Sequence, residues 1–160
     1  MRRAPCLLLL LVFAVRADET PRLATHEQTL LDLLNKERRR EKLPALTVHP
    51  LLTRAARLHA ENMARQEKFS HALDGKSVAM RVTDLGYDYR AVGENLALAE
   101  AERGGDPPPP AMADVHQHWM DSRSHRANIL GEKFREVGLA TARSKAGTYY
   151  YVQVFGVSRK

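Results

Sequence analysis

Near its C-terminal end the chain runs Tyr149-Tyr150-Tyr151-Val152-Gln153-Val154-Phe155-Gly156-Val157. Aromatic and β-branched residues dominate this stretch, and that composition predicts a β-strand. Successive side chains of a strand point to opposite faces of its sheet. Here both sets of alternate positions are largely apolar. We therefore expect this strand to lie inside a sheet that helices cover on both faces.

Two further strands are predicted. Val137 to Ala142 is apolar and β-branched, and the short segment 143–147 separates it from the stretch quoted above. The two strands should therefore form an antiparallel hairpin. Tyr87 to Ala99 mixes aromatic, β-branched and apolar residues, so it should hold a third strand around Glu94.

Helical patterns fill most of the N-terminal half. Thr25 and Gln28 have the pattern of a capping box at the start of a first helix. Pro50 suits the first turn of a second helix. Ser77 is a suitable N-cap for a short third helix, and Gly86 is suited to end it. We predict helices over about residues 25–41, 50–67, 78–85 and 111–121. Helices first and strands late, with a doubly covered sheet, predict an α+β fold: a three-layer α/β/α sandwich with a mainly antiparallel sheet.

The first residues have the pattern of a signal peptide. Arg2 and Arg3 precede the apolar run Leu7 to Val15, which is too short to span a bilayer. The residues before Ala17 predict cleavage after it, and an uncleaved anchor is the alternative. We expect residues 1–17 to be removed and residues 18–160 to form one domain without a transmembrane segment.

Cleavage would remove Cys6, which is the only cysteine. The remaining 143 residues are enough to bury a core without disulfides, and an exported chain of this kind is typical of a bacterial protein that is secreted or periplasmic. The net charge would fall from +6 to +3. Arg38-Arg39-Arg40 is then predicted to be a solvated helix face, and no nucleic-acid partner is expected.

One long loop is predicted. Residues 101–110 contain Gly104-Gly105 followed by four prolines, and polyproline is extended and makes no internal hydrogen bonds. We expect a Gly/Pro-rich surface loop within the domain rather than a domain boundary. A ligand for a proline-recognition module is the alternative.

Three polar residues from distant segments form the candidate site. They are His71 in Phe69-Ser70-His71, Glu94 in Gly93-Glu94-Asn95, and His125 in the stretch from Trp119 to Leu130. Each lies at or near the edge of a predicted element, where side chains converge on clefts. A polar cluster that only the fold can assemble is more typical of a site than of a solvated surface.

His71 and His125 are candidate ligands for Zn²⁺ or another divalent cation, because zinc prefers imidazole nitrogen. Zinc enzymes usually supply three protein ligands, and here Glu94 is either the third or an acceptor that orients an imidazole. A two-histidine site should be weak and exchangeable. The alternative is that both histidines only satisfy hydrogen bonds beside a buried cleft.

Glu94 is also the one candidate general base, which would act on a metal-bound water in a peptidase or other hydrolase. Its structural alternative is a strand carboxylate that accepts hydrogen bonds from the backbone, Asn95 or Ser122. A serine hydrolase is not expected, since neither Ser122 nor Ser124 lies in a nucleophile elbow. Ser122 is predicted to cap a turn or to donate to Glu94.

The other histidines are predicted to be exposed or packed rather than ligands. His116 and His118 are two residues apart on a helix, so they point to different sides and do not chelate one ion together. Trp119 is predicted to be part of the core or of the cleft wall.

Taken in order, these segments resemble the CAP superfamily, also called the SCP domain, and most of all its cysteine-free bacterial branch. The resemblance covers Leu30 to Gly156. The motifs that carry it are Leu34-Asn35-Lys36-Glu37-Arg38, Leu51 to Met63, Phe69-Ser70-His71, Gly86-Tyr87, Gly93-Glu94-Asn95-Leu96-Ala97, Trp119-Met120-Asp121-Ser122, His125-Arg126-Ala127-Asn128-Ile129-Leu130, Glu136-Val137-Gly138 and Tyr151-Val152-Gln153-Val154-Phe155-Gly156.

The resemblance implies an α/β/α sandwich with an open cleft that holds two histidines and two acidic residues. His71, His125 and Glu94 match three of these positions. Eukaryotic members carry a Glu shortly after the first histidine, whereas here Asp74 is the only acidic candidate. Sterols, fatty acids and cell-envelope components are the ligand classes that the resemblance implies.

The leading hypothesis is a secreted CAP module that is not clearly catalytic. Its cleft would bind a divalent metal and a small apolar or cell-envelope ligand, and it would be lined by His71, Asp74, Glu94, Ser122 and His125. The alternatives are a metal-assisted extracellular hydrolase with Glu94 as base and a structural module for protein interaction.

Overall fold

The strand that starts at Tyr149 lies in the middle of the sheet. The structure is a computed structural model that describes residues 22–100 and 109–159. Its four strands are β1 (Thr47–Val48), β2 (Tyr89–Glu100), β3 (Glu136–Arg143) and β4 (Thr148–Ser158), and their order in the sheet is β1-β3-β4-β2. β4 pairs antiparallel with β3 and with β2, so the predicted hairpin is confirmed.

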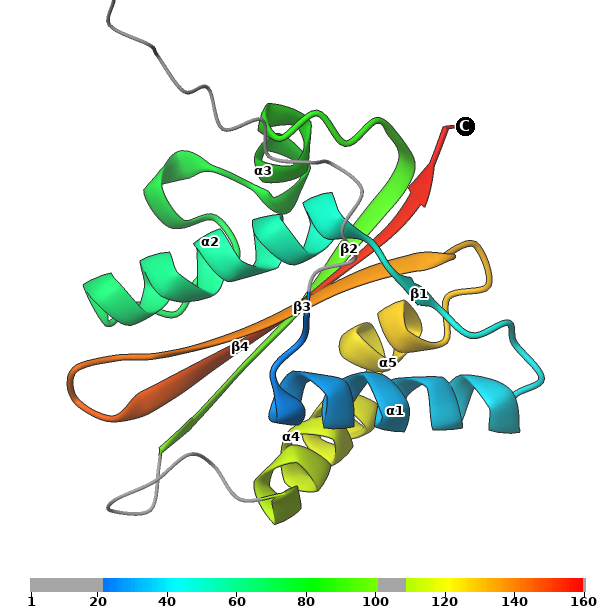
Figure 1. Cartoon of the computed structure of the whole chain (residues 1–160), viewed down its shortest axis with the longest axis horizontal. Coiled ribbons are helices and arrows are strands. Elements are labelled where there is room, and N and C mark those ends of the chain that lie inside the picture. The colour runs from blue at the N-terminus through cyan, green and yellow to red at the C-terminus, as the bar shows by residue number, and fades with distance from the viewer. Residues whose placement is uncertain (1–21, 101–108, 160) are drawn as a thin grey trace, which may run out of the picture.

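Helices cover both faces of this sheet (Figure 1). On one face lie α2 (Pro50–Gln66) and α3 (Val78–Asp84), with the short 3₁₀ turn η1 (Leu73–Gly75) between them. On the other face lie α1 (Thr25–Arg40), α4 (Pro109–Asp121) and α5 (Arg123–Ile129). The predicted three-layer α/β/α sandwich with a mainly antiparallel sheet is therefore confirmed.

The alternation along β4 divides the core in two. Tyr151 and Phe155 pack with the helices of the α1 face, whereas Val152 and Val154 pack with α2. β3 takes part through Gly138, whose missing side chain lets the backbone of α2 lie directly on the sheet. An apolar strand with two buried faces thus holds both helical layers together.

Most predicted element ends are confirmed. Pro50 is the first residue of α2, the Ser77 hydroxyl caps α3 by accepting from the Met80 N–H at 3.3 Å, and Gly86 follows α3 with a φ of +83°. The two-residue strand β1, which pairs in parallel with β3, was not predicted. The helix α5 was not predicted either, because its segment was expected to be a turn. Residues 1–17 and residues 101–108 of the predicted Gly/Pro-rich loop lie outside the described residues. The last two loop positions were predicted wrongly, because Pro109 and Pro110 are the first residues of α4.

The predicted capping box at Thr25 and Gln28 is wrong. The N-cap residue is Ala24, one residue before Thr25, and the Glu27 carboxylate accepts from the Ala24 N–H at 2.9 Å. Glu27 is 1% exposed, and its buried carboxylate also accepts from the Thr141 N–H of β3 at 3.0 Å and from Arg57 at 3.1 Å. The start of α1 is thereby fixed to the outer edge of β3.

The prediction of a solvated basic face is wrong for Arg38. Its side chain is fully buried and donates to the carbonyls of Pro44, Ile129, Gly131 and Phe134 at 2.8 to 3.3 Å. Burial lowers its pKa from the ordinary value, and the charge of Arg135 lowers it further. Arg38 thus joins the end of α1 to the segment between α5 and β3.

No helix among the described residues is long and apolar enough to span a membrane.

Candidate functional site

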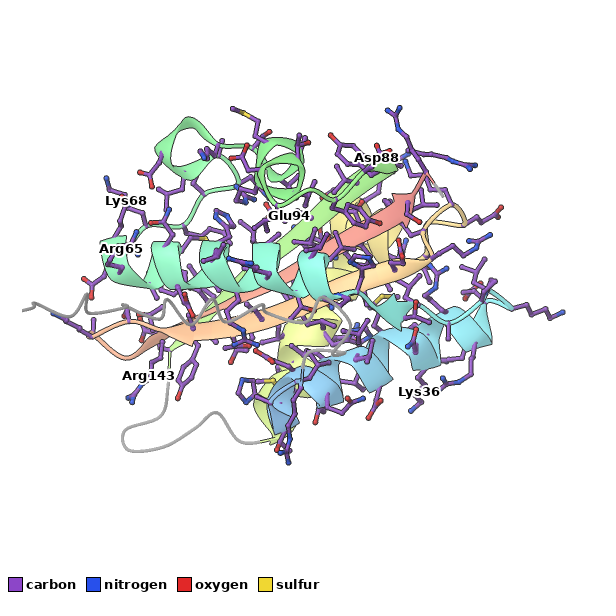
Figure 2. All side chains as sticks on the ribbon, turned by 45° about the horizontal axis from the view of Figure 1, so that its top comes forward. Lys36, Arg65, Lys68, Asp88, Glu94 and Arg143 are labelled. Atoms are coloured by element: carbon purple, nitrogen blue, oxygen red, sulfur yellow. The ribbon has the colours of Figure 1, made fainter. Side chains whose placement is uncertain are left out.

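His71 and Glu94 meet where the segment after α2 crosses the edge strand β2. The His71 Nδ1 lies 2.8 Å from Glu94 Oε1. The Glu94 side chain is only 1% exposed, whereas that of His71 is 58% exposed. Figure 2 shows Glu94 inside the fold, while Lys68 and Arg143 lie at its periphery. The carboxylate is therefore covered by an imidazole that is itself largely exposed.

Arg81 of α3 holds the second oxygen of the same carboxylate. Its Nη2 donates to Glu94 Oε2, and its Nη1 donates to the carbonyls of His71 at 3.0 Å and Lys76 at 2.6 Å. Its side chain is only 10% exposed. Both oxygens of Glu94 are thus engaged, and the negative charge of the cleft is balanced by a buried guanidinium.

Arg81 was missed at the level of sequence, although a signal is present. Val78, Val82 and Leu85 form the apolar stripe of α3, and Arg81 lies three residues after Val78 on the same stripe. A charged side chain on an inward stripe requires a buried partner. The position of Arg81 therefore points to an acid elsewhere in the fold.

His125 reaches the cleft from α5. Burial lowers its pKa, and the nearby charges of His71 and His118 lower it further. His118 of α4 is therefore close enough to His125 for its charge to act on that imidazole. The Nδ1 of His125 is buried and has no hydrogen-bond partner among the described residues.

A row of amides fixes α5 on β2. Asn128 Nδ2 donates to the Glu94 carbonyl at 3.1 Å and to Asn95 Oδ1 at 2.9 Å. Asn95 Nδ2 in turn donates to the His125 carbonyl at 3.1 Å. These bonds set the position of His125 relative to Glu94. Trp119 is fully buried and donates to the Leu96 carbonyl at 2.9 Å, so it belongs to the core.

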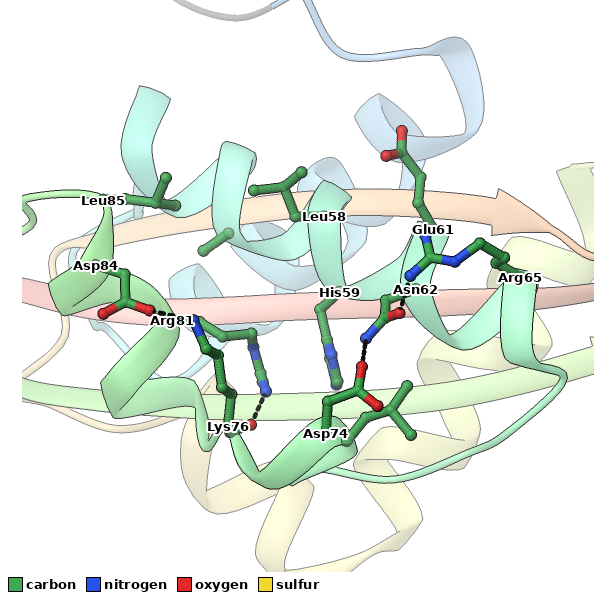
Figure 3. A pocket seen from close by; sticks show the side chains of 12 residues that line it. Leu58, His59, Glu61, Asn62, Arg65, Asp74, Lys76, Arg81, Asp84 and Leu85 are labelled. Carbon is green, nitrogen blue, oxygen red and sulfur yellow. Dashed lines mark hydrogen bonds and ion pairs between the residues drawn. The ribbon is translucent and has the colours of Figure 1, made fainter.

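Asp74 and Ser122, two of the predicted cleft residues, are bonded elsewhere. Asp74 accepts from Asn62 at 2.8 Å and from Gln66 at 2.8 Å, and these bonds lower the pKa of its carboxyl. In Figure 3 it points toward Asn62, while Arg81 lies on the other side of His59. Ser122 was expected to cap a turn or to donate to Glu94. It is the N-cap residue of α5 without a side-chain capping bond, and its hydroxyl lies 3.2 Å from that of Ser124.

His59 of α2 contacts the backbone of the segment that carries His71. It is 1% exposed, and its Nε2 lies 3.0 Å from the Ser70 carbonyl, directly before His71. Burial lowers its pKa, as does the charge of Arg81. His59 is thus a packed residue that holds the His71 segment against α2.

Residues 31–155 match the family described as CAP, the cysteine-rich secretory protein family. The chain belongs to the CAP family. The resemblance inferred from the ordered motifs is therefore confirmed.

The relatives of this CAP chain include bacterial proteins. An uncharacterized protein of Bacillus subtilis (strain 168), YkwD, is 28% identical over 135 residues, which cover 83% of this chain and 48% of YkwD. The chain thus spans about half the length of this curated relative.

Two solved structures share the CAP fold. An extracellular protein of Bacillus anthracis that contains an SCP domain is 25% identical, with a TM-score of 0.65 over 82% of this chain and 40% of that one. An outer surface protein of Borrelia burgdorferi is 17% identical, with a TM-score of 0.74 over 88% of this chain and 100% of that one.

A resident zinc ion does not fit the side chains of this CAP cleft. Zinc sites in proteins use three or four protein ligands. Within residues 22–100 and 109–159, no three His, Cys, Asp or Glu side chains are placed to hold one ion. Glu94 already has both oxygens engaged, which leaves His71 and His125 as the two available imidazoles.

Proposed function

We propose that this CAP chain is a secreted binding module without turnover, whose cleft takes up a divalent cation weakly and whose ligand is a small apolar or cell-envelope molecule. The observation that carries this proposal is the state of Glu94. A general base must lie within hydrogen-bond reach of the water or substrate whose proton it removes. Both Glu94 oxygens are engaged, by His71 and Arg81, and the side chain is buried. The contacts of Glu94 therefore favour binding over the hydrolase alternative.

The weak metal site is supported by the state of the two imidazoles. When His71 Nδ1 donates to Glu94, its Nε2 keeps a free lone pair, as in carboxylate–histidine–metal arrangements. Burial lowers the pKa of His125, which favours the unprotonated ring that a metal ligand requires. Two ligands make an exchangeable site rather than a permanent one.

Calorimetric titration of Zn²⁺ tests this part. We expect weak binding to one site in the natural protein and loss of that binding in the His71→Ala/His125→Ala variant. Equal binding by both proteins would contradict the metal site. A hydrolase would instead show Zn²⁺-dependent cleavage of peptide or ester substrates that Glu94→Gln abolishes.

The apolar part of the ligand is supported by a pocket beside the cleft. This pocket has a volume of about 370 Å³ and lies between α2 and the segment from η1 to α3 (Figure 3). Ala55, Leu58, Leu73 and Leu85 form its apolar part, and the other eight lining residues are polar or charged. One of these, Arg81, lines both the pocket and the cleft. Leu58 is 50% exposed, which is high for a large apolar side chain. The volume lies in the range of small-molecule sites, about 300–1,000 Å³.

A charge placed in this pocket should prevent apolar binding. Leu58→Glu is expected to weaken binding of a fluorescent fatty alcohol by about tenfold or more, because a Leu contact is worth roughly 1.5–3 kcal/mol. The matched control is Leu98→Glu, since Leu98 is 48% exposed and does not line the pocket. Equal losses in the two variants, measured by fluorescence titration, would contradict the pocket as the ligand site.

A further inference from the structure

We infer that the guanidinium of Arg81 supplies, beside Glu94, the positive charge that a metal ion would otherwise supply. Arg81 is thus the residue that lowers the affinity of this cleft for divalent cations. The inference rests on the proposed function, because it concerns the same cleft and explains why its metal affinity is weak. It also assigns a specificity role to a residue outside the predicted set of His71, Asp74, Glu94, Ser122 and His125.

The first support is the burial of the charge pair. The side chains of Arg81 and Glu94 are 10% and 1% exposed, so solvent screens their charges little. The guanidinium at contact distance balances the charge of the carboxylate, so the pair presents little net negative charge to a second cation. A divalent ion that approaches His71 and His125 therefore meets a repelling Arg81 instead of an attracting Glu94.

The second support is the way in which Arg81 is anchored. Besides Glu94, it donates to the carbonyls of His71 and Lys76, at 3.0 and 2.6 Å. A metal that displaced it would leave a buried cation and two carbonyls without these bonds, which is costly. The guanidinium therefore does not swing aside to admit an ion.

The third support is the absence of a replacement acid among the described residues. Asp74, the only acidic candidate near His71 in the sequence, is bonded to Asn62 and Gln66. Asp84 forms an exposed ion pair with Lys76 at 2.7 Å. Within the part of the chain that the structure describes, Glu94 is thus the carboxylate that pairs with His71, and its balance with Arg81 sets the local charge.

Two substitutions separate the charge of Arg81 from its bonds. Arg81→Gln removes the charge, whereas Arg81→Lys keeps it and loses the planar fork. We expect Arg81→Gln to bind Zn²⁺ at least about tenfold more tightly than the natural protein, and Arg81→Lys to bind no more tightly. Calorimetry measures the affinity, and the visible absorption of Co²⁺ reports entry of imidazole ligands. Equal affinities in the two variants would overturn the inference.

A second substitution in the Arg81→Gln protein tests whether the gain in Zn²⁺ affinity arises in this cleft. His71→Ala or Glu94→Gln, added to Arg81→Gln, should remove the gain, whereas a gain that survives Glu94→Gln would overturn the inference. The His71→Ala/His125→Ala variant of the otherwise natural protein tests the proposed function separately. That test can fail while Arg81→Gln still gains affinity, so the two failures are distinguishable.

Arg81→Gln leaves a buried Glu94 without its cation, so this variant is also compared by thermal melting with and without Zn²⁺. Zn²⁺ should raise the melting temperature of Arg81→Gln and not that of Arg81→Lys, because only a ligand of the folded state stabilises it. If Arg81→Gln unfolds without metal, recovery of its circular dichroism on adding Zn²⁺ supports the inference. Failure to recover overturns it.

Discussion

Arg38→Ala should destabilise the protein by about 3–5 kcal/mol, with a fall in melting temperature of about 10–15 °C. The Arg38 side chain is fully buried and donates to four backbone carbonyls. An alanine leaves these acceptors without their donors and also opens a cavity in the layer between α1 and α5. Thermal melting followed by circular dichroism measures the change.

The adjacent arginines are matched controls. Arg39 and Arg40 are exposed, and Arg40 pairs only with Glu37, also on α1, at 3.1 Å within the described residues. Alanine at either position should change the stability by no more than about 0.5 kcal/mol. Arg38→Lys should also be strongly destabilised, because an ammonium group cannot reproduce the fork that reaches separate carbonyls. An Arg38→Ala protein with the same melting temperature as the Arg39 and Arg40 variants would contradict this account.

Gly138→Ala should cost about 3 kcal/mol, at the upper end for overpacking. A methyl group at this position would lie 2.0 Å from the Leu52 carbonyl carbon and 2.2 Å from the Thr53 nitrogen. Both atoms belong to the backbone of α2, so no side-chain rotation relieves the clash. The helix has to move off β3, and it carries His59, which holds the segment before His71. The substitution should therefore also weaken metal binding by the cleft.

Gly147→Ala is a control that distinguishes the cost of a steric clash from the cost of an unfavourable backbone conformation. Gly147 has a φ of +96°, whereas Gly138 is outside the positive-φ region, yet a methyl group at Gly147 would meet only the flexible end of Arg143 at 3.6 Å. Its cost should be the strain of a left-handed alanine, about 1–2 kcal/mol. Chemical denaturation of both variants checks the order, and a larger loss at Gly147 would contradict the packing argument.

The fold was predictable where the pattern is local. The period of β4 and the leucine stripe of α1 are properties of neighbouring residues, so the layers followed from them. β1 has two residues and exists only because it pairs with Glu136 and Val137, far along the chain. No local pattern marks such a strand.

The contact between His71 and Glu94 was predictable from the motifs, whereas the partners of the two side chains were less so. His71 and Glu94 lie in contact as the motifs suggested. Arg81 was overlooked because a single charge in a short helix resembles a surface residue until its exposure is known. Arg38 was misjudged for a related reason: its acceptors are backbone carbonyls, three of which lie 91 to 96 residues away, and carbonyls have no sequence signature.

The Glu27 carboxylate has a consequence beyond the start of α1. β1 pairs with β3 only at Glu136 and Val137, so the rest of that border has no neighbouring strand among the described residues. Unpaired strand borders are templates on which other copies of a chain add and aggregate. Glu27 takes the Thr141 N–H and places a buried negative charge where an incoming strand would need to dock. The same carboxylate that begins a helix thus disfavours fibril-like self-association.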